Sequence, residues 1–483
     1  MSKREIIEFA IADMISEKVV GIGECIPSIR KMAQLYGVSA TPVIEAYRNL
    51  ECCGLIESRH KSCFIAVSDD VSLLSGYIQK KQEASFEAEK SEEKTEPSPP
   101  IEPEEKAVEF DFGKTAFECP IQNKEILAQC ISKTLKNSPE TLGIDPYGYD
   151  DPSLVDALSQ YLLHNRFIVS KKEISIVNND ISTAFILAIQ SCSRRDQTIL
   201  LTAPCAEVHK YAAKISGRKC IHIPSSFNQC VDLDMLEYLV GQDEKIACII
   251  VAPNYMMPSG AIMSDGDKRR LVDICQTRNI AIIEDDSCGD LYFSGQCPRT
   301  LKSMAAEQTI YISTFTTSVS SGIPVHWACP GKYSESFRYY RNNISSMPPV
   351  FLQNSFAMYM RSRYFKKHMQ SLRELMRESV EAVRLAVNRS FPEASHVSKP
   401  GGGFWLYIEL PRTVNSEKLE EKALESGISY YTCGGKDDPH KENCISLNCS
   451  VVAGSPGKIR GVYELGKIVK ELCDEKEYLA QIG

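Results

Sequence analysis

The spacing of hydrophobic residues near the start of the chain predicts two helices followed by a hairpin. One helix face carries apolar residues at three- and four-residue intervals: Ile29, Met32, Ala33 and Leu35. A second helix face repeats this pattern: Val43, Ala46, Tyr47 and Leu50. Ser39 or Thr41 can cap the second helix. The segments 55–59 and 64–67 then predict the two strands of a wing, so residues 1–70 are predicted to form a winged helix-turn-helix domain.

Beyond residue 109, short apolar runs alternate with amphipathic segments, which is the pattern of an α/β fold. Four of these runs are suited to a buried parallel sheet: Thr198–Leu201, Ala247–Ala252, Ile280–Glu284 and Thr309–Ile312. Segments 154–163 and 267–278 have the periodicity of amphipathic helices. The segments GGGFWLYIELP and NCISLNCS predict strands of a smaller α+β subdomain at about 375–483. We therefore expect residues 109–483 to form an α/β body with this subdomain at its end.

Residues 71–108 separate the two regions. Most of this segment is rich in Glu, Lys, Ser and Pro and poor in apolar residues. Such a composition cannot bury enough surface to offset the entropy that is lost when the chain becomes ordered. We expect a flexible linker, with a solvated helix at 80–94 as the alternative for its charged part.

The composition excludes several classes of protein. With 43% hydrophobic and 24% charged residues among 483, the chain is an ordinary globular protein of two or three folding units. The net charge of −8 argues against a nonspecific nucleic-acid coat and against a polybasic membrane anchor. No apolar run reaches about 18 residues, and the start MSKREIIEF lacks the apolar core of a signal peptide. We expect a cytoplasmic protein that does not enter the membrane.

Cysteine is unusually frequent, with 19 residues in the chain. The sequence has no CxxC pair, and many cysteines lie inside apolar runs such as 247–251 and 444–449. Metal binding therefore has little support, and buried, reduced thiols are the favoured interpretation.

The first 70 residues resemble the GntR family of bacterial regulators. The matching positions are Pro27, Ser28, Arg30, Ala33, Gly37, Val38, Ser39, Pro42, Val43, Leu50, Gly54, Leu55 and Ile56. The resemblance implies that Ser28 and Arg30 contact phosphate. It implies that Ser39, Thr41 and Pro42, at the start of the second helix, lie at the DNA. It places four residues at the wing tip: Arg59, His60, Lys61 and Ser62.

Charge supports this DNA interface only locally. Residues 1–70 contain more acidic than basic side chains, but phosphate contacts need a basic edge rather than a basic domain. Five residues can supply that edge: Arg30, Lys31, Arg48, Arg59 and Lys61. The family often has arginine where this chain has Ala40 and Ile44, so we expect modest affinity and a shallow salt dependence. A helical domain that binds only protein is the alternative.

Segments of the body resemble fold-type-I aminotransferases in their order and approximate spacing: YGYDDPSLVDALSQYL, VAPNYMMPSGAIMSDGDKRRLVDIC, IIEDDSCGDLYF, YISTFTTSVSSGIP and PGGGFWLYIELP. A GntR head joined to such a body resembles the MocR subfamily of regulators. The resemblance covers nearly the whole chain outside the linker. It implies a mostly parallel sheet flanked by helices, a smaller C-terminal subdomain, and pyridoxal phosphate as the family's cofactor.

The residue that would hold this cofactor differs from the family pattern. A pyridoxal phosphate enzyme forms an imine with a lysine amine, and no other side chain replaces that amine. In the family the lysine follows Thr-Phe-Ser, but here Thr314 and Phe315 precede Thr316 and Thr317. The position where an arginine would bind the phosphate is Pro324, which offers neither charge nor a backbone N–H.

Other expected cofactor contacts are also replaced. The phosphate cup falls at Asp180, Ile181 and Ser182, the stacking aromatic at Ala206, the asparagine at Met257, the tyrosine at Cys288 and the substrate-binding arginine at Ser446. Asp285 still fits the position that pairs with the pyridine nitrogen, although a purely structural bond explains this acid equally well. Lys302 and Lys332 are the nearest lysines in sequence, but neither occupies the loop after Phe315.

These observations favour a dimeric DNA-binding transcriptional regulator with a catalytically degenerate aminotransferase-like domain. A dimeric body would hold two heads together and raise their effective concentration at paired half-sites. The body would act as a dimerisation scaffold, or its cleft would bind a neutral or aromatic small-molecule effector. The alternatives are a regulator or aminotransferase that retains pyridoxal phosphate, held without a covalent link in the regulator, and a scaffold that binds only protein.

Overall fold

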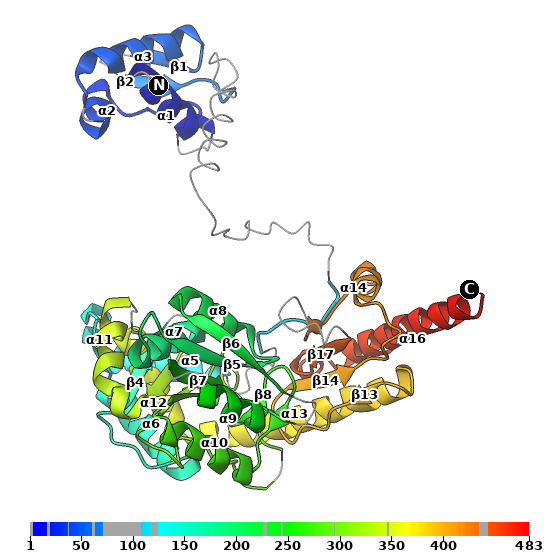
Figure 1. Cartoon of the computed structure of the whole chain (residues 1–483). Helices are drawn as coiled ribbons and strands as arrows, with labels where there is room; N and C mark the ends of the chain where they lie inside the picture. Colours follow the sequence, from blue (N-terminus) through cyan, green and yellow to red (C-terminus); the bar gives the residue numbers. More distant parts are fainter. Residues whose placement is uncertain are drawn as a thin grey trace. The chain divides into compact units, whose positions relative to one another are not determined.

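The computed structural model describes residues 3–16, 20–36, 38–59, 63–70, 108–117, 124–178, 180–225, 229–242, 245–293, 295–344, 347–433 and 443–482. They belong to two compact units, residues 1–102 and 103–483, each considered by itself below (Figure 1). The predicted linker, apart from Val108, lies outside the described residues. No helix in the described stretches is long and apolar enough to cross a membrane.

The first unit is a winged helix-turn-helix domain, as the hydrophobic pattern predicts. Its elements are α1 (Lys3–Ser16), α2 (Ile29–Tyr36), α3 (Ala40–Cys52), β1 (Ile56–Arg59) and β2 (Cys63–Ala66). Their apolar faces meet in one core, which contains Ile11 of α1, Met32 of α2 and Leu50 of α3. Helix α1 was not expected from the sequence pattern. Gly54 follows α3 with a φ of +74°, a left-handed conformation that suits glycine.

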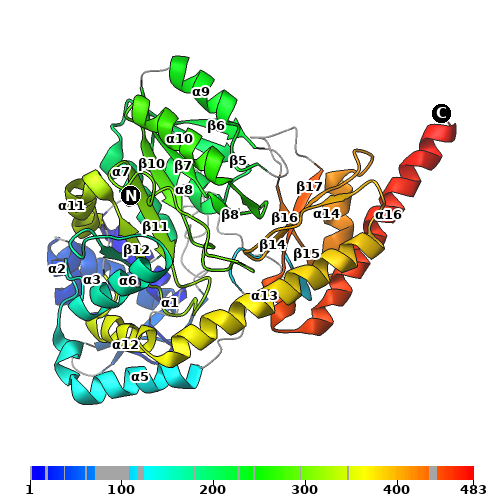
Figure 2. The ribbon, with the colours of Figure 1, turned by 90° about the horizontal axis from the view of Figure 1, so that it is seen from below.

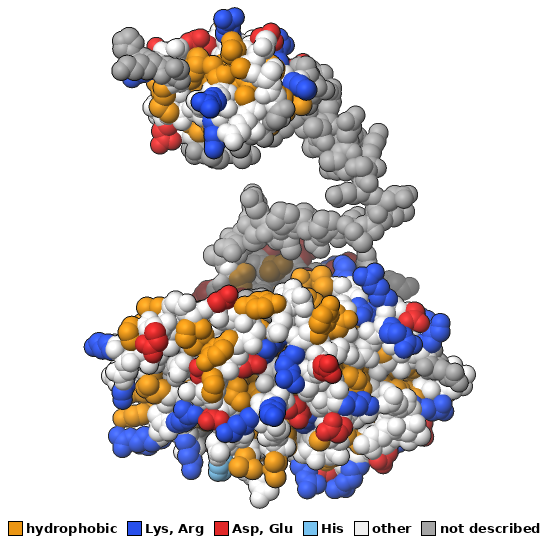
Figure 3. All heavy atoms as spheres, turned by 90° about the vertical axis from the view of Figure 1, so that its left-hand side faces the viewer, with side chains coloured by type: hydrophobic (Ala, Val, Ile, Leu, Met, Phe, Trp, Pro, Cys, Tyr) orange, Lys and Arg blue, Asp and Glu red, His pale blue; other side chains and the backbone are white. Residues whose placement is uncertain are grey.

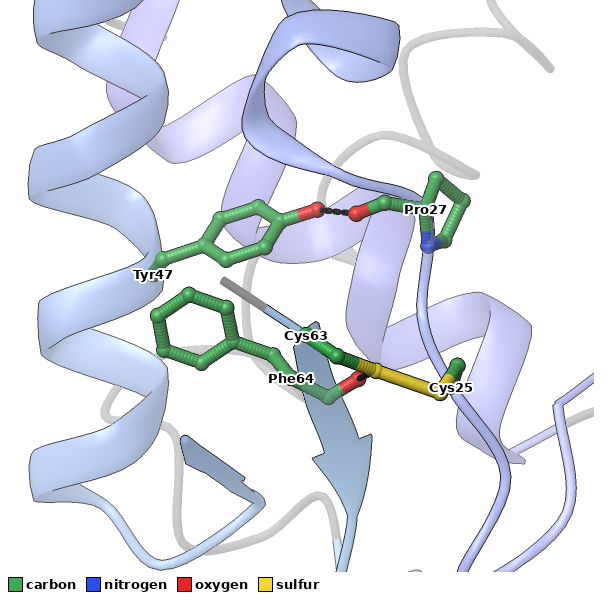
Figure 4. The surroundings of a disulfide bond; sticks show 5 residues. All are labelled: Cys25, Pro27, Tyr47, Cys63 and Phe64. Atoms are coloured by element: carbon green, nitrogen blue, oxygen red, sulfur yellow. Dashed lines mark hydrogen bonds between the residues drawn. A yellow bond between two sulfur atoms is a disulfide. The ribbon is translucent and has the colours of Figure 1, made fainter. Parts of the chain in front are cut away.

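A disulfide joins Cys25, which precedes α2, to Cys63, the first residue of β2 (Figure 4). The expectation of reduced thiols is therefore wrong for this pair. The two cysteines are 38 residues apart in sequence, but an antiparallel bridge between Cys25 and Ile65 brings their backbones together. Most of the other described cysteines are buried, in agreement with the apolar runs that contain them.

The second unit contains a seven-stranded sheet with the strand order β4-β12-β11-β10-β7-β5-β6. The strands are β4 (Ser175–Val177), β5 (Thr198–Ala203), β6 (Lys219–Pro224), β7 (Ile246–Val251), β10 (Ala281–Asp285), β11 (Thr309–Thr314) and β12 (His326–Cys329). Strand β12 is antiparallel to both of its neighbours, and the other pairings are parallel. The four predicted strands are confirmed as β5, β7, β10 and β11, which lie side by side.

Successive residues of a strand point to opposite sides of the sheet, so the continuous apolar runs give the sheet two apolar faces. Helices cover both of these faces (Figures 1 and 2). Ile250 and Ile283 share a core with residues of α7 and α8. The preceding residues, Ile249 and Ile282, share a different core with residues of α9 and α10. The helices and short elements of this layer are α5 (Lys124–Asn137), η2 (Pro139–Gly143), α6 (Pro152–Asn165), α7 (Ile181–Cys192), α8 (Glu207–Ser216), α9 (Leu233–Gln242), β8 (Asn254–Met256), β9 (Ala261–Ile262), α10 (Asp265–Thr277), η3 (Gly331–Tyr333), α11 (Ser334–Ile344) and α12 (Val350–Met360).

The long helix α13 (Arg363–Ser390) leads from this layer to a smaller C-terminal subdomain, where it packs against α16 (Ile459–Ile482) (Figure 2). The other elements there are β13 (His396–Val397), β14 (Trp405–Glu409), α14 (Ser416–Glu425), β15 (Ile428–Ser429), β16 (Tyr431–Thr432), β17 (Cys444–Asn448), α15 (Ser450–Ala453) and η5 (Pro456–Lys458). The two predicted strands are confirmed as β14 and β17, the centre of a four-stranded antiparallel sheet. Strand β3 (Phe110–Asp111) pairs with β15, so the first described residues of the body belong to this subdomain.

Candidate functional site

The residues predicted to contact DNA lie on or beside α2, α3 and the hairpin of the head. Those that the structure describes are exposed or half-buried: Ser28, Arg30, Ser39, Thr41, Pro42, Arg48 and Arg59. Thr41 and Arg48 share the exposed face of α3, because the opposite face is buried in the core. His60, Lys61 and Ser62 lie outside the described residues. The DNA contacts of all these residues stay predictions.

Short-range contacts order the start of α2 and connect the segment before it to α3. Ser28 Oγ accepts a hydrogen bond from the backbone N–H of Lys31 at 3.3 Å and so caps α2. Ser39 occupies the capping position of α3, but its hydroxyl makes no capping hydrogen bond. The Tyr47 hydroxyl of α3 donates to the Pro27 carbonyl oxygen (Figure 4). The segment before α2 is therefore fastened to α3.

Glu45 is a residue of this surface that sequence reasoning missed. It is exposed on α3 between Thr41 and Arg48, four residues after the first and three before the second. A carboxylate at this position repels phosphate but can accept a hydrogen bond from the amino group of cytosine. The sequence could have shown this, because residues three and four positions apart on a helix share a face, and Glu45 has this spacing from Thr41 and Arg48.

A cavity of about 970 Å³ opens in the second unit at the carboxyl ends of the central strands. Asp285 ends β10 and Thr314 ends β11. Most positions that the family resemblance assigns to the cofactor line this cavity: Asp180, Ile181, Ser182, Ala206, Met257, Asp285, Cys288, Thr314, Thr316, Thr317 and Pro324. Phe117 and Phe404, which were not predicted, form an aromatic part of the wall, with their ring centroids 5.2 Å apart.

The loop after β11 lines the cavity with hydroxyl groups. Thr314 Oγ1 accepts a hydrogen bond from the Thr316 backbone N–H at 3.0 Å. Thr317 Oγ1, which the sequence resemblance aligns with the family's lysine, donates to the Ser287 carbonyl oxygen at 2.6 Å. This hydroxyl is thus engaged with the protein backbone, and a hydroxyl cannot form an imine with an aldehyde.

Helix α7 begins at the cavity with a carboxylate at its capping position. Asp180 Oδ1 accepts a hydrogen bond from the Ser182 backbone N–H at 3.3 Å. A helix N-terminus attracts anions, but the charge of Asp180 already occupies this one. A phosphate dianion at the same place would meet a like charge. Pro324, which also lines the cavity, contributes no positive charge to offset this repulsion.

Both carboxylate oxygens of Asp285 have protein partners. His209 Nε2 of α8 lies 2.8 Å from Oδ2, and the Ser287 hydroxyl donates to Oδ1 at 2.5 Å. Burial alone would lower the pKa of His209, but hydrogen bonds with Asp285 and Cys205 raise it to about 9. Burial alone would raise the pKa of Asp285, but the hydrogen bonds from His209 and Ser287 hold it below its ordinary value. The two residues therefore form an ion pair at neutral pH.

No lysine or arginine occurs among the described residues that line the cavity. Lys302 Nζ instead pairs with Glu173 Oε1 at 2.6 Å, and Lys332 Nζ donates to Gln308 Oε1 at 2.8 Å. The carboxylates on the described part of the wall are Asp180, Glu207 and Asp285. The sequence suggested a cleft that binds a neutral or aromatic ligand, and it did not anticipate these three acids together on the wall.

Ser446, the position of the family's substrate-binding arginine, is not among the lining residues. It is buried on β17, and its hydroxyl donates to the Pro258 carbonyl oxygen at 2.9 Å. The expectation that Ser446 contributes to the cleft is therefore wrong. Its side chain is short and is used in a contact between the subdomain and the segment after β8.

Fold and comparison with known proteins define the class: a GntR-type DNA-binding regulator fused to an aminotransferase-like domain, the arrangement of MocR-type proteins. Residues 3–65 match the gntR family of bacterial regulatory proteins. Residues 133–436, more than half of the chain, match the family of class I and II aminotransferases. The chain belongs to the aminotransferase class I and II family and carries a GntR head.

Curated relatives share the whole arrangement. YjiR of Escherichia coli, an uncharacterized HTH-type transcriptional regulator, is 24% identical over 93% of this chain and 95% of its own length. YdfD of Bacillus subtilis, another uncharacterized HTH-type transcriptional regulator, is 22% identical over 97% of this chain and 96% of its own length. The similarity thus extends through the head and the body.

Solved structures share the fold of the body. The α-aminoadipate aminotransferase LysN of Thermus thermophilus has 22% identity and a TM-score of 0.67, covering 76% of this chain and 93% of that chain. The kynurenine aminotransferase of Pyrococcus horikoshii has 19% identity and a TM-score of 0.71, covering 82% of this chain and 99% of that chain. At these identities the likeness establishes the fold alone.

Pyridoxal phosphate is the cofactor of this fold family, and the described wall of the cavity does not fit it. The cofactor needs an amine, which Thr317 lacks, and a cationic or neutral phosphate cup, where this chain has Asp180. Ala206 offers no ring to stack on the pyridine. Asp285 is the one group on the described wall that matches the cofactor's needs, and it is already paired with His209.

Proposed function

We propose that this protein is a dimeric transcriptional regulator whose aminotransferase-like body has no transaminase activity and forms no covalent link to pyridoxal phosphate. The observation that carries the proposal is the loop after β11, where Thr317 donates to Ser287 in place of a lysine. The acid at the start of α7 supports it, because Asp180 makes this helix N-terminus a poor phosphate site.

The head of this regulator binds duplex DNA in the cytoplasm, with α3 in the major groove and the wing against the backbone. Ser28, Arg30 and Arg48 contact phosphate or base edges, and Ser39, Thr41 and Pro42 bring the start of α3 to the bases. Four wing residues contact the backbone: Arg59, His60, Lys61 and Ser62. The exposure of the described members of this set supports these roles.

The body joins two copies of the chain. Two segments of its surface carry several of its exposed large apolar side chains: Leu142, Ile144, Tyr147, Tyr149, Tyr339 and Ile344. The two segments that carry them are adjacent, because Asn342 lies beside Gly148. Figure 3 shows hydrophobic patches among the charged side chains on the side of the body that carries α11. Exposed apolar side chains that gather on one side often mark interfaces, which supports a homodimer formed through this side.

The cavity binds a small effector that lacks phosphate. Its volume of about 970 Å³ is in the range of ligand sites, about 300–1,000 Å³. Phe117 and Phe404 supply apolar wall, and Asp180 and Glu207 disfavour anions. A neutral or cationic effector suits this wall better than the phosphorylated cofactor of the family.

A regulator that retains pyridoxal phosphate is the second candidate. The position of Asp285 on the cavity wall favours it, because the resemblance places the pyridine nitrogen of the family's cofactor there. The two candidates differ in colour, since pyridoxal phosphate that is bound without a covalent link is itself yellow.

A gel shift with the full-length protein and the DNA upstream of its own gene tests the DNA-binding role. Replacing Arg30→Ala together with Lys61→Ala removes two charge-assisted contacts, so we expect affinity to fall by about 100-fold or more. The matched control is Lys3→Ala, which removes an exposed cation at the start of α1 and leaves the shift unchanged. A shift that survives the double substitution contradicts the proposed surface. If the wild-type protein shifts no DNA, the result contradicts the DNA-binding role and favours the alternative, a scaffold that binds only protein.

A further inference from the structure

The disulfide of the head lies between two of the segments proposed to contact DNA. Cys63 stands directly opposite Arg59 in the hairpin, at the base of the wing tip. Cys25 precedes Ser28, the residue that caps α2, by three positions. The bond therefore ties the segment that leads into α2 to the strand that returns from the wing tip (Figure 4).

Contacts around the disulfide hold the same segments together independently of the bond. The backbone N–H of Ile26 donates to the Phe64 carbonyl oxygen at 2.9 Å, and that of Ala66 donates to the Glu24 carbonyl oxygen at 3.1 Å. Tyr47 packs edge-on against Phe64, with ring centroids 5.0 Å apart. When the disulfide is reduced, these contacts keep the two thiols close, so the bond can form again without a search through the unfolded chain.

Solvent reaches this pair of cysteines. Cys25 is exposed and Cys63 is half-buried. Their Cα atoms lie 6.4 Å apart, within the range that a disulfide spans without moving the backbone. Disulfides are rare in the reducing cytoplasm, and those that form there are usually transient and redox-sensing. An exposed pair in a cytoplasmic DNA-binding domain is therefore placed for reversible chemistry.

We propose that Cys25 and Cys63 form a reversible thiol–disulfide site, and that its oxidation by low-molecular-weight disulfides strengthens DNA binding by the head. The link to DNA rests on the proposed DNA-binding surface. The redox site itself rests only on the geometry of the two cysteines.

The exchange involves two protein thiols and one small disulfide. The exposed Cys25 thiolate attacks a sulfur of the small disulfide, which forms a mixed disulfide and releases one small thiolate. The Cys63 thiolate then attacks the Cys25 sulfur, which closes the protein disulfide and releases the second small thiolate. The protein sulfurs lose two electrons, the small disulfide gains them, and the two protons pass through solvent to the released thiolates. Excess small thiol reverses both steps.

The direction of the effect follows from the loss of freedom on binding. The start of α2 and the wing must contact the DNA at the same time, which fixes the distance between these two parts of the head. The disulfide sets part of that separation before DNA binds, whereas the reduced head must restrict the wing during binding. We therefore expect the oxidised protein to bind DNA about three- to tenfold more tightly than the reduced protein.

Peptide mapping of the full-length protein tests the redox site. The protein is incubated with oxidised glutathione or with excess reduced glutathione, blocked with an alkylating agent, digested without reductant, and analysed by mass spectrometry. We expect a cross-linked peptide pair containing Cys25 and Cys63 after oxidation, and alkylated Cys25 and Cys63 after reduction. A pair that never cross-links, or one that excess glutathione fails to reduce, overturns the site.

The same two preparations are then titrated into a labelled duplex selected from a random pool by the oxidised full-length protein. We expect tighter binding by the oxidised form, and no redox dependence in the double variant Cys25→Ser, Cys63→Ser, which should resemble the reduced protein. The matched control is Cys52→Ser, which removes an exposed free thiol of the same head and keeps the redox effect. Equal or weaker binding by the oxidised protein overturns the coupling. Failure to select or bind any DNA overturns the proposed DNA-binding function and the coupling with it, while the mapping result stands separately.

Discussion

The wall of the cavity and the buried polar network around Asp286 differ in the cost that a substitution carries. The wall contains Thr317 and Pro324, which the sequence resemblance aligns with a lysine and an arginine of the family. In the buried network, Asp286 is fully buried and lies 3.1 Å from the Arg166 guanidinium, which is buried as well. Asp286 follows Asp285 directly in sequence, so two neighbouring acids belong to two different regions.

Asp286 is fully paired. Its Oδ1 accepts a hydrogen bond from Asn254 Nδ2 at 2.9 Å, and its Oδ2 accepts one from the Tyr311 hydroxyl at 2.9 Å. Arg166 has a second partner in Asp290, at 2.9 Å. Removing one member of such a network leaves a buried charge without a partner, which is costly to folding. Replacing Thr317 or Pro324, which line the cavity, leaves no such charge. A fold can therefore persist when the residues needed for its family's chemistry are absent.

The largest effect is expected from breaking the buried network around Asp286. Asp286→Ala leaves the Arg166 guanidinium short of one buried partner, so we predict that the free energy of unfolding falls by about 3–5 kcal/mol. Thr317→Ala, on the wall, removes one hydrogen bond and should cost about 1 kcal/mol. Urea unfolding of the two full-length variants, followed by circular dichroism, measures the difference. Equal losses would show that the two regions do not differ as described.

A smaller, pH-dependent effect is expected at the boundary between the two regions, where His209 pairs with Asp285. The pKa of His209 is raised in the folded protein from 6.5 to about 9, so its stabilisation is complete below about pH 6.5 and is lost as the pH rises through about 9. The pKa of Asp285 is lowered, so its contribution is present near neutral pH and is lost on acidification. We predict that His209→Gln removes a stabilisation on the order of 3 kcal/mol at pH 6.5 and costs much less at pH 9.5. Urea unfolding of both proteins at the two pH values measures this difference, and a variant that loses the same stability at both pH values would contradict the ion pair.

Much of the fold could be predicted from the sequence because its central strands are continuous apolar runs. Strands β5, β7, β10 and β11 are buried on both faces, so every residue in them is constrained to suit the core. The edge strand β6, Lys219–Pro224, mixes exposed and buried residues and gave no clear pattern. The two-residue strand β3 is too short to leave a periodic signal.

The candidate sites were predictable where one segment carries the signal and not where two distant segments meet. Thr317 and Asp180 could be assigned because each lies in a motif whose order along the chain is known. His209 and Asp285 are 76 residues apart, and no local spacing pairs them. Cys25 and Cys63 were missed for the same reason, since a chain with 19 cysteines offers many pairings. The roles of the DNA-contacting residues stay predictions.

The most direct measurement is mass spectrometry of the purified full-length protein after reduction with borohydride, with and without added pyridoxal phosphate. Borohydride converts an imine into a stable pyridoxyl-lysine. Because Thr317 replaces the amine, and the described wall offers no lysine, we predict no stoichiometric adduct on any peptide and no imine absorption band. A stoichiometric pyridoxyl adduct on a single lysine of the native protein would contradict the central claim that the body does not hold the cofactor covalently.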